Sequence, residues 1–155
     1  MTHDQLIKDF YSACNQRDYA FMQQAYHPKA TFFDPVFQEL NAQKVKAMWQ
    51  MLLTASKDLR VECSNVHSNN ASGSCRWDAW YTFSKTGRKV HNIIHAKFQF
   101  EHGLIIRHED QFDLWRWSRQ ALGTSGLLLG WSDIVQGKVR ATAKGSLDKF
   151  IAAGQ

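Results

Sequence analysis

The feature that most constrains this chain is a change, near Leu59, in the spacing of its apolar residues. Before this point the apolar residues recur at helical spacing, as in amphipathic helices. After it they alternate with polar residues, as in strands that bury one face. The alternating stretches cover about residues 59–68, 72–84, 89–101 and 104–115, separated by turns at Asn69-Asn70, Thr86-Gly87 and His102-Gly103. We therefore predict a set of helices followed by an antiparallel meander.

The helical part of the chain contains three predicted helices. Thr2 and Gln5 resemble a capping box, so the first helix starts there and ends near residues 15–17. The second helix runs over about residues 18–26. The third begins after Asn41, whose side chain can cap it, and continues in an apolar stripe at helical spacing.

A short extended segment separates the second and third helices. Pro28 stops the second helix, and residues 30–33 are predicted to be extended. Asp34 precedes Pro35, and the residue before a proline is driven toward extended backbone. Asp34 is therefore expected to close the segment in a turn.

The register of the second hairpin follows from the position of its turn. With the turn centred between Thr86 and Gly87, one face pairs Phe83 with Val90, Tyr81 with Asn92, Ala79 with Ile94 and Trp77 with Ala96. The other face then pairs Trp80 with Ile93, Asp78 with His95 and Arg76 with Lys97. Because this second face mixes charged groups with large apolar ones, we predict that it forms the sheet-to-sheet contact of a homodimer.

The last part of the chain returns to helical spacing. A short helix is predicted to reach Leu122, residues 123–126 break it, and a last helix starts at about Ser132. We expect one domain over residues 1–155, in which residues 116–155 form a helical C-terminal extension. A chain of this length buries roughly two-thirds of its unfolded surface, which is enough for one core and a cavity.

Composition excludes several classes of protein. The chain is 44% hydrophobic and 21% charged, so it is neither disordered nor fibrous. No apolar run approaches the ~20 residues that cross a bilayer. The N-terminus carries acid early and lacks the regions of a secretory signal, so we expect a cytoplasmic location. Cys14, Cys63 and Cys75 show neither disulfide nor thiolate-metal spacing and are expected to be small buried hydrophobes.

The net charge of +5 is concentrated in the C-terminal extension. Its basic residues are dispersed, and no basic stripe with interleaved exposed aromatics can be placed, so we predict no nucleic-acid partner. Large apolar residues near these charges leave two alternatives. They could lie at an anionic membrane surface, or, as we favour, they cover a pocket mouth or pad a dimer. These residues are Trp115, Trp117, Leu127 to Leu129 and Trp131.

Three segments resemble one known superfamily. They are HPKATFFDPVF at 27–37, GRKVHNIIHAKFQFEHGLI at 87–105 and HEDQFD at 108–113. With the order of helices and strands, they make the chain similar to the SnoaL-like and ketosteroid-isomerase-like branch of the nuclear transport factor 2-like superfamily. The resemblance covers about residues 3–117. It implies an α+β fold in which a cone-shaped, curved antiparallel sheet wraps around three N-terminal helices and a largely apolar pocket, with a C-terminal helical tail.

The resemblance does not imply one function, because the superfamily includes isomerases, cyclases, epoxide hydrolases, dehydratases and binding proteins. It places Asp34 where ketosteroid isomerases have the general base that moves a proton between carbons beside a carbonyl. It also places Phe10 where those enzymes have a tyrosine and Ala96 where they have a second acid. Those two groups hold the oxyanion that develops during the reaction. Their absence argues against a plain steroid isomerase and requires other partners for Asp34.

Partners for Asp34 are expected on the same face of the sheet. His108 and Asp110 resemble the region in which SnoaL-like cyclases carry a histidine and an aspartate for acid–base work. We therefore predict Asp34, His108 and Asp110 as catalytic residues. The side chains predicted to bind the ligand are Phe10, Tyr26, Phe32, Trp49, Trp77, Tyr81, Asn92, Ile94 and Phe112.

Two functions follow from these residues. One is a cofactor-free isomerase or cyclase that uses Asp34 as base on a small, mostly apolar carbonyl compound; the other is a binding protein for a small hydrophobic metabolite. Structural roles also stay open, because Asp34 can cap its own turn, and Tyr81 with Asn92 can plug a cavity. No cofactor or metal is predicted: the chain has no phosphate loop, nucleophile elbow or HExxH motif, and His91 and His95 would lie ~13 Å apart on a strand.

Overall fold

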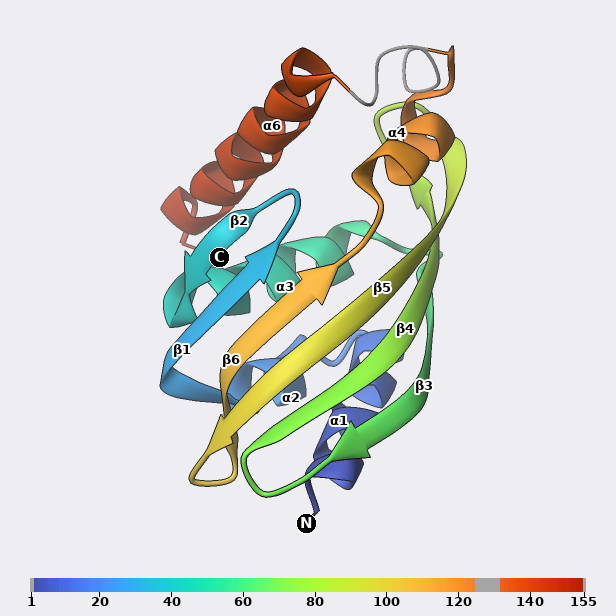
Figure 1. Ribbon diagram of the computed structural model, residues 1–155. Coiled ribbons are helices and arrows are strands. Elements are labelled where there is room, and N and C mark those ends of the chain that lie inside the picture. The colour runs from blue at the N-terminus through green and yellow to red at the C-terminus, as the bar shows by residue number, and fades with distance from the viewer. Residues whose placement is uncertain (1, 125–131, 155) are drawn as a thin grey trace.

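The computed structural model describes residues 2–124 and 132–154, and Figure 1 shows a sheet with helices behind it. The helices behind the sheet are α1 (His3–Asn15), α2 (Tyr19–Gln24) and α3 (Ala42–Ala55). The strands are β1 (Tyr26–Asp34), β2 (Gln38–Asn41), β3 (Arg60–Ser68), β4 (Ser72–Phe83), β5 (Arg88–Glu101) and β6 (Leu104–Gln111). Two helices follow the sheet, α4 (Leu114–Leu122) and α6 (Asp133–Ala152).

Side-chain caps set the starts of the first helices. Thr2 Oγ1 accepts a hydrogen bond from the backbone N–H of Gln5 at 3.1 Å, and Asn41 caps α3 in the same way. These caps confirm the predicted starts of the first and third helices. The helix α2 ends at Gln24 rather than at Tyr26, because Tyr26 already belongs to β1.

The strands form one sheet in the order β2-β1-β6-β5-β4-β3. From β3 to β6 the sheet is the predicted antiparallel meander. Two features were not predicted: β1 pairs with β6 in parallel, and the short β2 pairs with β1. The ladder between β1 and β6 is interrupted between Tyr26 and Thr31. Pro28 lies in this interruption, where the missing N–H of proline breaks no ladder bond.

The predicted register of the hairpin between β4 and β5 is wrong by two residues on β5. Phe83 lies opposite Arg88, Tyr81 opposite Val90, Ala79 opposite Asn92 and Trp77 opposite Ile94. The cause is the turn, in which Gly87 takes a positive φ of 71° and donates its N–H to the Phe83 carbonyl at 2.8 Å. A shift of two keeps every side chain on its predicted face, but Tyr81 and Asn92 are not directly opposite.

The hydrophobic core lies between the sheet and the helices that cover it. Its fully buried members come mainly from α1, α3 and the strands β1, β5 and β6, and they include Ile7, Phe10, Phe32, Met48, Ile94, Phe98 and Ile105. Gly73 in β4 permits a close approach of α1, because a Cβ there would lie 2.9 Å from Ile7 Cδ1. Cys14 and Cys75 are buried as predicted, Cys63 is half-buried, and all three are free.

The helix α4 packs beside the upper end of β5, and α6 lies on the side of β2 (Figure 1). The strand β6 ends at Gln111, earlier than predicted, because the Asp113 side chain caps α4 by accepting from Arg116 N at 3.0 Å. Ser132 caps α6, which confirms the predicted start of the last helix. Leu147 of α6 is buried, and α6 lies against α3. The predicted helix ends at Leu122, and residues 125–126 of the predicted break lie outside the described residues.

These elements confirm the predicted α+β fold with its curved sheet, N-terminal helices and C-terminal helix. Within the described residues, the structure contains no helix that combines the length and the apolar character needed to cross a membrane. Of the apolar residues discussed for a membrane contact, Trp115 is exposed and Trp117 is buried. Leu127 to Leu129 and Trp131 lie outside the described residues.

Candidate functional site

Aromatic side chains fill the space between α1, α3 and the inner face of the sheet. The Phe10 ring lies edge-on to Tyr26 at 5.7 Å and to Trp49 at 5.9 Å. The Trp49 ring in turn lies 6.0 Å from Trp77. The structure therefore brings these predicted ligand-binding residues together as tightly packed neighbours. The predicted residues that are buried here are Phe10, Tyr26, Phe32, Trp49, Trp77 and Ile94.

A chain of hydrogen bonds crosses this aromatic interior. Trp49 Nε1 donates to the Tyr26 hydroxyl at 2.9 Å, and that hydroxyl lies 2.8 Å from His108 Nδ1. His108 Nε2 lies 2.9 Å from Asp110 Oδ1, which also accepts from Trp77 Nε1 at 3.4 Å. His108 has 0% and Asp110 3% of its surface exposed. The predicted pair is thus assembled, deep inside the protein.

The donor chemistry of the ends fixes the direction of this chain. An indole N–H can only donate, so the Tyr26 oxygen must accept from Trp49, which leaves the Tyr26 hydroxyl proton for His108 Nδ1. His108 then carries its own proton on Nε2 and donates it to the Asp110 carboxylate. Every polar group has a partner in this arrangement.

Asp34 lies at the end of β1 in the predicted turn. Its Oδ1 accepts from the backbone N–H groups of Val36 at 2.8 Å and Phe37 at 2.6 Å. The backbone N–H of Gln38 also interacts with the carboxyl and lowers its pKa. Burial raises the pKa of the Asp34 carboxyl from 3.8 to about 7; the amides lower it, and the charge of Asp110 adds to the increase. Asp34 is therefore a buried acid with one oxygen anchored and a pKa near neutrality.

The parallel pairing of β1 and β6 explains why Asp34 and Asp110 interact. Phe32 lies opposite His108 and Phe33 opposite Glu109, so Asp34 follows the same register toward Asp110. Side chains at alternate positions share a face, which places all three predicted catalytic residues on the inner face of neighbouring strands. Asp110 is also directly opposite Ala96 on β5. A carboxylate is thus present beside the position where the resembling isomerases have their second acid.

A hollow of about 370 Å³ opens where β6 ends and β5 continues toward α4. Two of the predicted ligand-binding residues, Asn92 and Phe112, line this hollow. Its lining also includes Ile93, His95 and Arg116. Phe112 and Tyr81 pack against the same second apolar cluster, which includes Trp117. The remaining predicted ligand residues therefore lie toward this end, where Tyr81 and Phe112 also pack against the main core. A hollow of this size lies within the range of small-molecule pockets, about 300 to 1,000 Å³.

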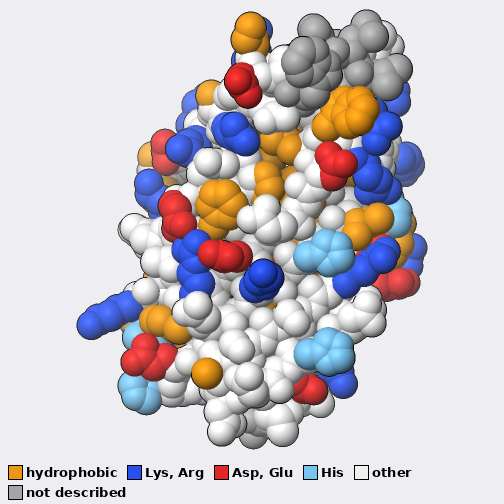
Figure 2. Space-filling model, viewed as in Figure 1, with side chains coloured by type: hydrophobic (Ala, Val, Ile, Leu, Met, Phe, Trp, Pro, Cys, Tyr) orange, Lys and Arg blue, Asp and Glu red, His pale blue; other side chains and the backbone are white. Residues whose placement is uncertain are grey.

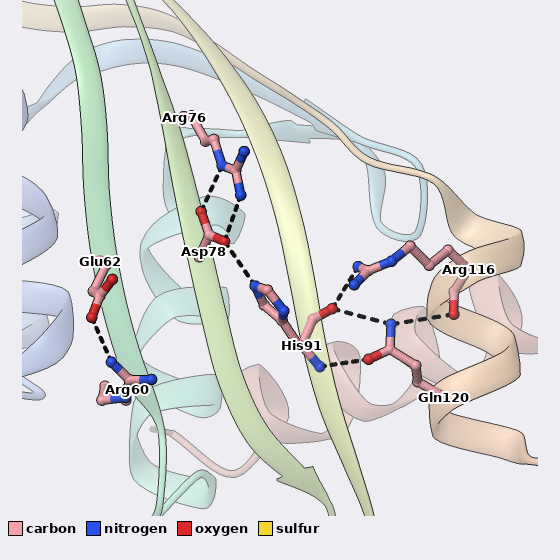
Figure 3. A network of polar contacts seen from close by, with 7 residues as sticks. All are labelled: Arg60, Glu62, Arg76, Asp78, His91, Arg116 and Gln120. Atoms are coloured by element: carbon pink, nitrogen blue, oxygen red, sulfur yellow. Dashed lines mark hydrogen bonds and ion pairs between the residues drawn. The ribbon is translucent and has the colours of Figure 1, made fainter.

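The outer face of the sheet carries a separate polar network (Figure 3). Asp78 binds Arg76 at 2.8 Å and His91 Nε2 at 2.7 Å, and the His91 ring stacks on Trp80 at 4.5 Å. The Arg60 guanidinium lies over the Trp80 ring, 3.9 Å from the ring centre. Figure 2 shows acidic, basic and histidine side chains interspersed over this face, with apolar side chains gathering in its upper half.

No metal centre is assembled by the side chains described here. Within residues 2–124 and 132–154, no group of three or more His, Cys, Asp or Glu residues is placed to hold a metal ion. His91 binds Asp78 instead.

Sequence reasoning missed two residues of the site. Trp117 was assigned only to the tail, but its Nε1 donates to the Tyr81 hydroxyl at 2.7 Å. Tyr11 stacks on Trp77 at 5.1 Å, and its buried hydroxyl has no hydrogen-bond partner among the described residues. The helical spacing of Tyr11 indicated a buried position, but no signal in the sequence pointed to Trp117.

The comparisons with known proteins agree with this fold. A sequence profile described as a SnoaL-like domain matches residues 7–108, about two-thirds of the chain. A search of curated proteins gave no significant match.

Several solved structures are similar. IdmH from Streptomyces antibioticus, proposed to be a polyketide cyclase, is 18% identical with a TM-score of 0.65 over 77% of this chain and 97% of that one. A protein from Jannaschia, proposed to be a SnoaL-like polyketide cyclase, is 12% identical with a TM-score of 0.67 over 77% and 90%. An epoxide hydrolase of the LEH-like type from M. tuberculosis is 14% identical with a TM-score of 0.64 over 80% and 90%. At these identities the likeness shows the fold alone.

Proposed function

The chain belongs to the SnoaL-like domain family of the nuclear transport factor 2-like superfamily, and from that premise we propose that it is a cofactor-free acid–base enzyme. The proposed reaction is an isomerisation or a cyclisation. The substrate class is a small, mostly apolar carbonyl compound, and Asp34 is the general base.

The observation that carries this proposal is the state of the Asp34 carboxyl. A general base works best when its pKa lies near the working pH, and burial raises the pKa of Asp34 to about 7. The two amides on Oδ1 fix the orientation of the carboxyl and leave Oδ2 to take a proton. An ordinary turn aspartate is exposed and keeps a low pKa, so the burial of Asp34 favours chemistry over simple capping.

His108 and Asp110 have a supporting role in this proposal. Both ring nitrogens of His108 are bonded inside the protein, so His108 positions Tyr26 and Asp110 rather than contacting the substrate. Asp110 acts on Asp34 through its charge, which raises the pKa of Asp34 and favours the protonated form that returns the proton.

The substrate is proposed to approach Asp34 at the end of β6, near a hollow that opens on the outer side of the sheet between β5 and α4. Its lining includes the apolar Ile93 and Phe112 and the amide of Asn92, which suits a compact apolar molecule with one or two polar oxygens. We also propose a homodimer through the outer sheet face, where the Trp80 ring lies among the charged groups of Arg60, Arg76 and Asp78. Sedimentation as a dimer at micromolar concentration would support this contact, and sedimentation as a monomer would exclude it.

Proton exchange tests the proposed chemistry. A panel of small cyclic ketones is incubated with the protein in D₂O, and the loss of the α C–H signal is followed by proton NMR. We expect exchange that increases with pH through about 7 and is lost in Asp34→Asn. Asp148→Asn on the exposed side of α6 is the matched control and keeps the exchange. Exchange that persists in Asp34→Asn would remove Asp34 from the mechanism.

A second function is supported by the packing of the interior. Because Phe10, Trp49, Trp77 and Phe98 fill the cone, the polar chain around His108 can serve stability alone, and the hollow can retain an apolar metabolite without chemistry. A binding protein of this kind holds a co-purified ligand that mass spectrometry detects. Its retention is unchanged in Asp34→Asn, and no proton exchange occurs in either protein.

A further inference from the structure

The hydroxyl group of Tyr81 has a proton with no acceptor among the described residues. It accepts a hydrogen bond from Trp117 Nε1 at 2.7 Å, and because an indole N–H can only donate, the Tyr81 oxygen is the acceptor. The Tyr81 proton must then point elsewhere, and no described residue accepts it. The incoming bond from Trp117 also polarises the hydroxyl, because chains of hydrogen bonds strengthen one another.

This hydroxyl lies in the same region of the protein as Asp34. Burial and then the negative charge of Asp34 raise the pKa of Tyr81, so the two groups lie near each other. Val36, which follows the Asp34 turn, packs against the same apolar cluster as Tyr81. On β5, Asn92 is two residues from the partner of Tyr81, and Asn92 lines the hollow.

Helix α4 is held firmly enough to fix Trp117 in place. β6 stops before His91, so the edge of β5 is open there, and Gln120 of α4 covers it (Figure 3). The Gln120 side chain accepts from His91 N at 2.7 Å and donates to His91 O at 3.1 Å, as a neighbouring strand would. Arg116 donates to the same carbonyl at 2.6 Å. Trp117 lies between these two anchors, with 8% of its surface exposed.

We propose that the Tyr81 hydroxyl, positioned by Trp117, donates to the substrate oxygen on which negative charge develops. It would replace the donors that are missing at Phe10 and Ala96. Tyr81 is then a catalytic residue and Trp117 a positioning residue. Trp117 lies beyond the matched residues 7–108, so the C-terminal extension completes the site. This inference rests on the proposed use of Asp34 as base.

The step balances within these residues. The C–H bond next to the substrate carbonyl breaks, and its proton goes to Asp34 Oδ2. The electron pair of that bond forms the C=C bond of an enolate, and the carbonyl π pair moves onto oxygen. The Tyr81 O–H holds that oxygen by a charge-assisted hydrogen bond. Reversal at another carbon returns the proton and completes an isomerisation. Alternatively, the enolate carbon attacks a second carbonyl of the same molecule; the new C–C bond closes a ring, the π pair of that carbonyl moves onto its oxygen, and this alkoxide takes the proton from Asp34.

Binding of 4-nitrophenolate tests the donor without requiring turnover. The probe carries its charge on one oxygen, like an enolate, and its visible absorbance changes on binding. Asp34→Asn serves as the background, because the amide imitates the protonated Asp34 that faces the enolate. Tyr81→Phe and Trp117→Phe are added to it, and Tyr19→Phe on α2 and the exposed Trp115→Phe on α4 are matched controls.

We expect Tyr81→Phe to weaken phenolate binding by about 10- to 100-fold, as for a hydrogen bond to a charged group. Trp117→Phe should weaken it by roughly two- to four-fold through the lost polarisation. The controls bind as the background does. A second readout, carbon NMR of labelled tyrosine Cζ, separates positioning from folding: Trp117→Phe raises the pKa of Tyr81, because the bond from Trp117 lowers it.

Three outcomes overturn the inference. They are equal phenolate binding by Tyr81→Phe and the background, an absence of saturable binding by the background, and an unchanged Tyr81 pKa in Trp117→Phe. None of them touches the exchange experiment on Asp34. If exchange still depends on Asp34 while Tyr81→Phe binds normally, the base stands and another group holds the oxyanion. If phenolate binding depends on Tyr81 but exchange does not depend on Asp34, the proposed function fails instead.

Discussion

The buried Asp34 carboxyl should make the stability of the protein depend on pH in a direction opposite to that of most carboxyl groups. Its pKa rises from 3.8 in an exposed reference to about 7 in the folded protein. Between these values the folded state holds a proton that the unfolded chain releases. The stability that this group contributes is therefore present at low pH and is lost as the pH rises through about 7.

The magnitude follows from the size of the shift. About three pKa units, at 1.36 kcal/mol for each unit, correspond to about 4 kcal/mol. Asp34→Asn removes the ionisation but keeps an oxygen that can accept from Val36 and Phe37. The free energy of unfolding of the wild type, minus that of the variant, should fall by about 4 kcal/mol between about pH 4 and pH 8.

Urea unfolding, followed by the fluorescence of the six tryptophans, measures both proteins at each pH. In the difference between the two free energies of unfolding, the contributions of the other titrating groups cancel. The exception is Asp110, because its charge interacts with Asp34. We expect the variant to be the more stable protein at about pH 8. A difference that stays constant from about pH 4 to pH 8 would refute the raised pKa and the reasoning from burial.

Two further substitutions test the framework of the site. Tyr26→Phe leaves the Trp49 N–H and His108 Nδ1 without their partner, so we expect a loss of roughly 2 to 5 kcal/mol in the free energy of unfolding by urea, while Tyr19→Phe changes little. Gly73→Ala places a Cβ 2.9 Å from Ile7 Cδ1 and 3.0 Å from the Phe100 ring, so it should cost about 1 to 3 kcal/mol; a cost that Ile7→Val does not relieve would contradict the steric explanation.

Most of the elements of this fold follow from local signals. The caps at Thr2, Asn41 and Ser132, and the alternation after Leu59, act within a few residues and predicted the right elements. The strand β2 was missed because four residues carry too little periodicity. The register of β4 and β5 was missed because it depends on how the backbone closes around Gly87, which alternation alone does not specify.

In the candidate site, too, local sequence signals placed some residues correctly and could not predict the contacts between distant residues. Asp34 and the alternation of His108 with Asp110 could be placed on one inner face from sequence, because strand geometry fixes which face each residue occupies. The contacts that give these residues their chemistry join distant parts of the chain. Tyr26 and His108 are separated by 82 positions, and Trp117 reaches Tyr81 only because α4 folds back on β5. Hydrophobic spacing carries no information on such pairings.

The central claim is that Asp34 is a buried base with a pKa near neutrality, and a direct titration of its side chain tests it. Carbon NMR of protein labelled at the aspartate carboxyl carbons follows each signal with pH, and comparison with Asp34→Asn assigns the signal of Asp34. The account predicts a midpoint near 7 for this signal, well above the ordinary 3.8. A midpoint near 3.8 would show that Asp34 is an ordinary turn carboxylate and would contradict the account.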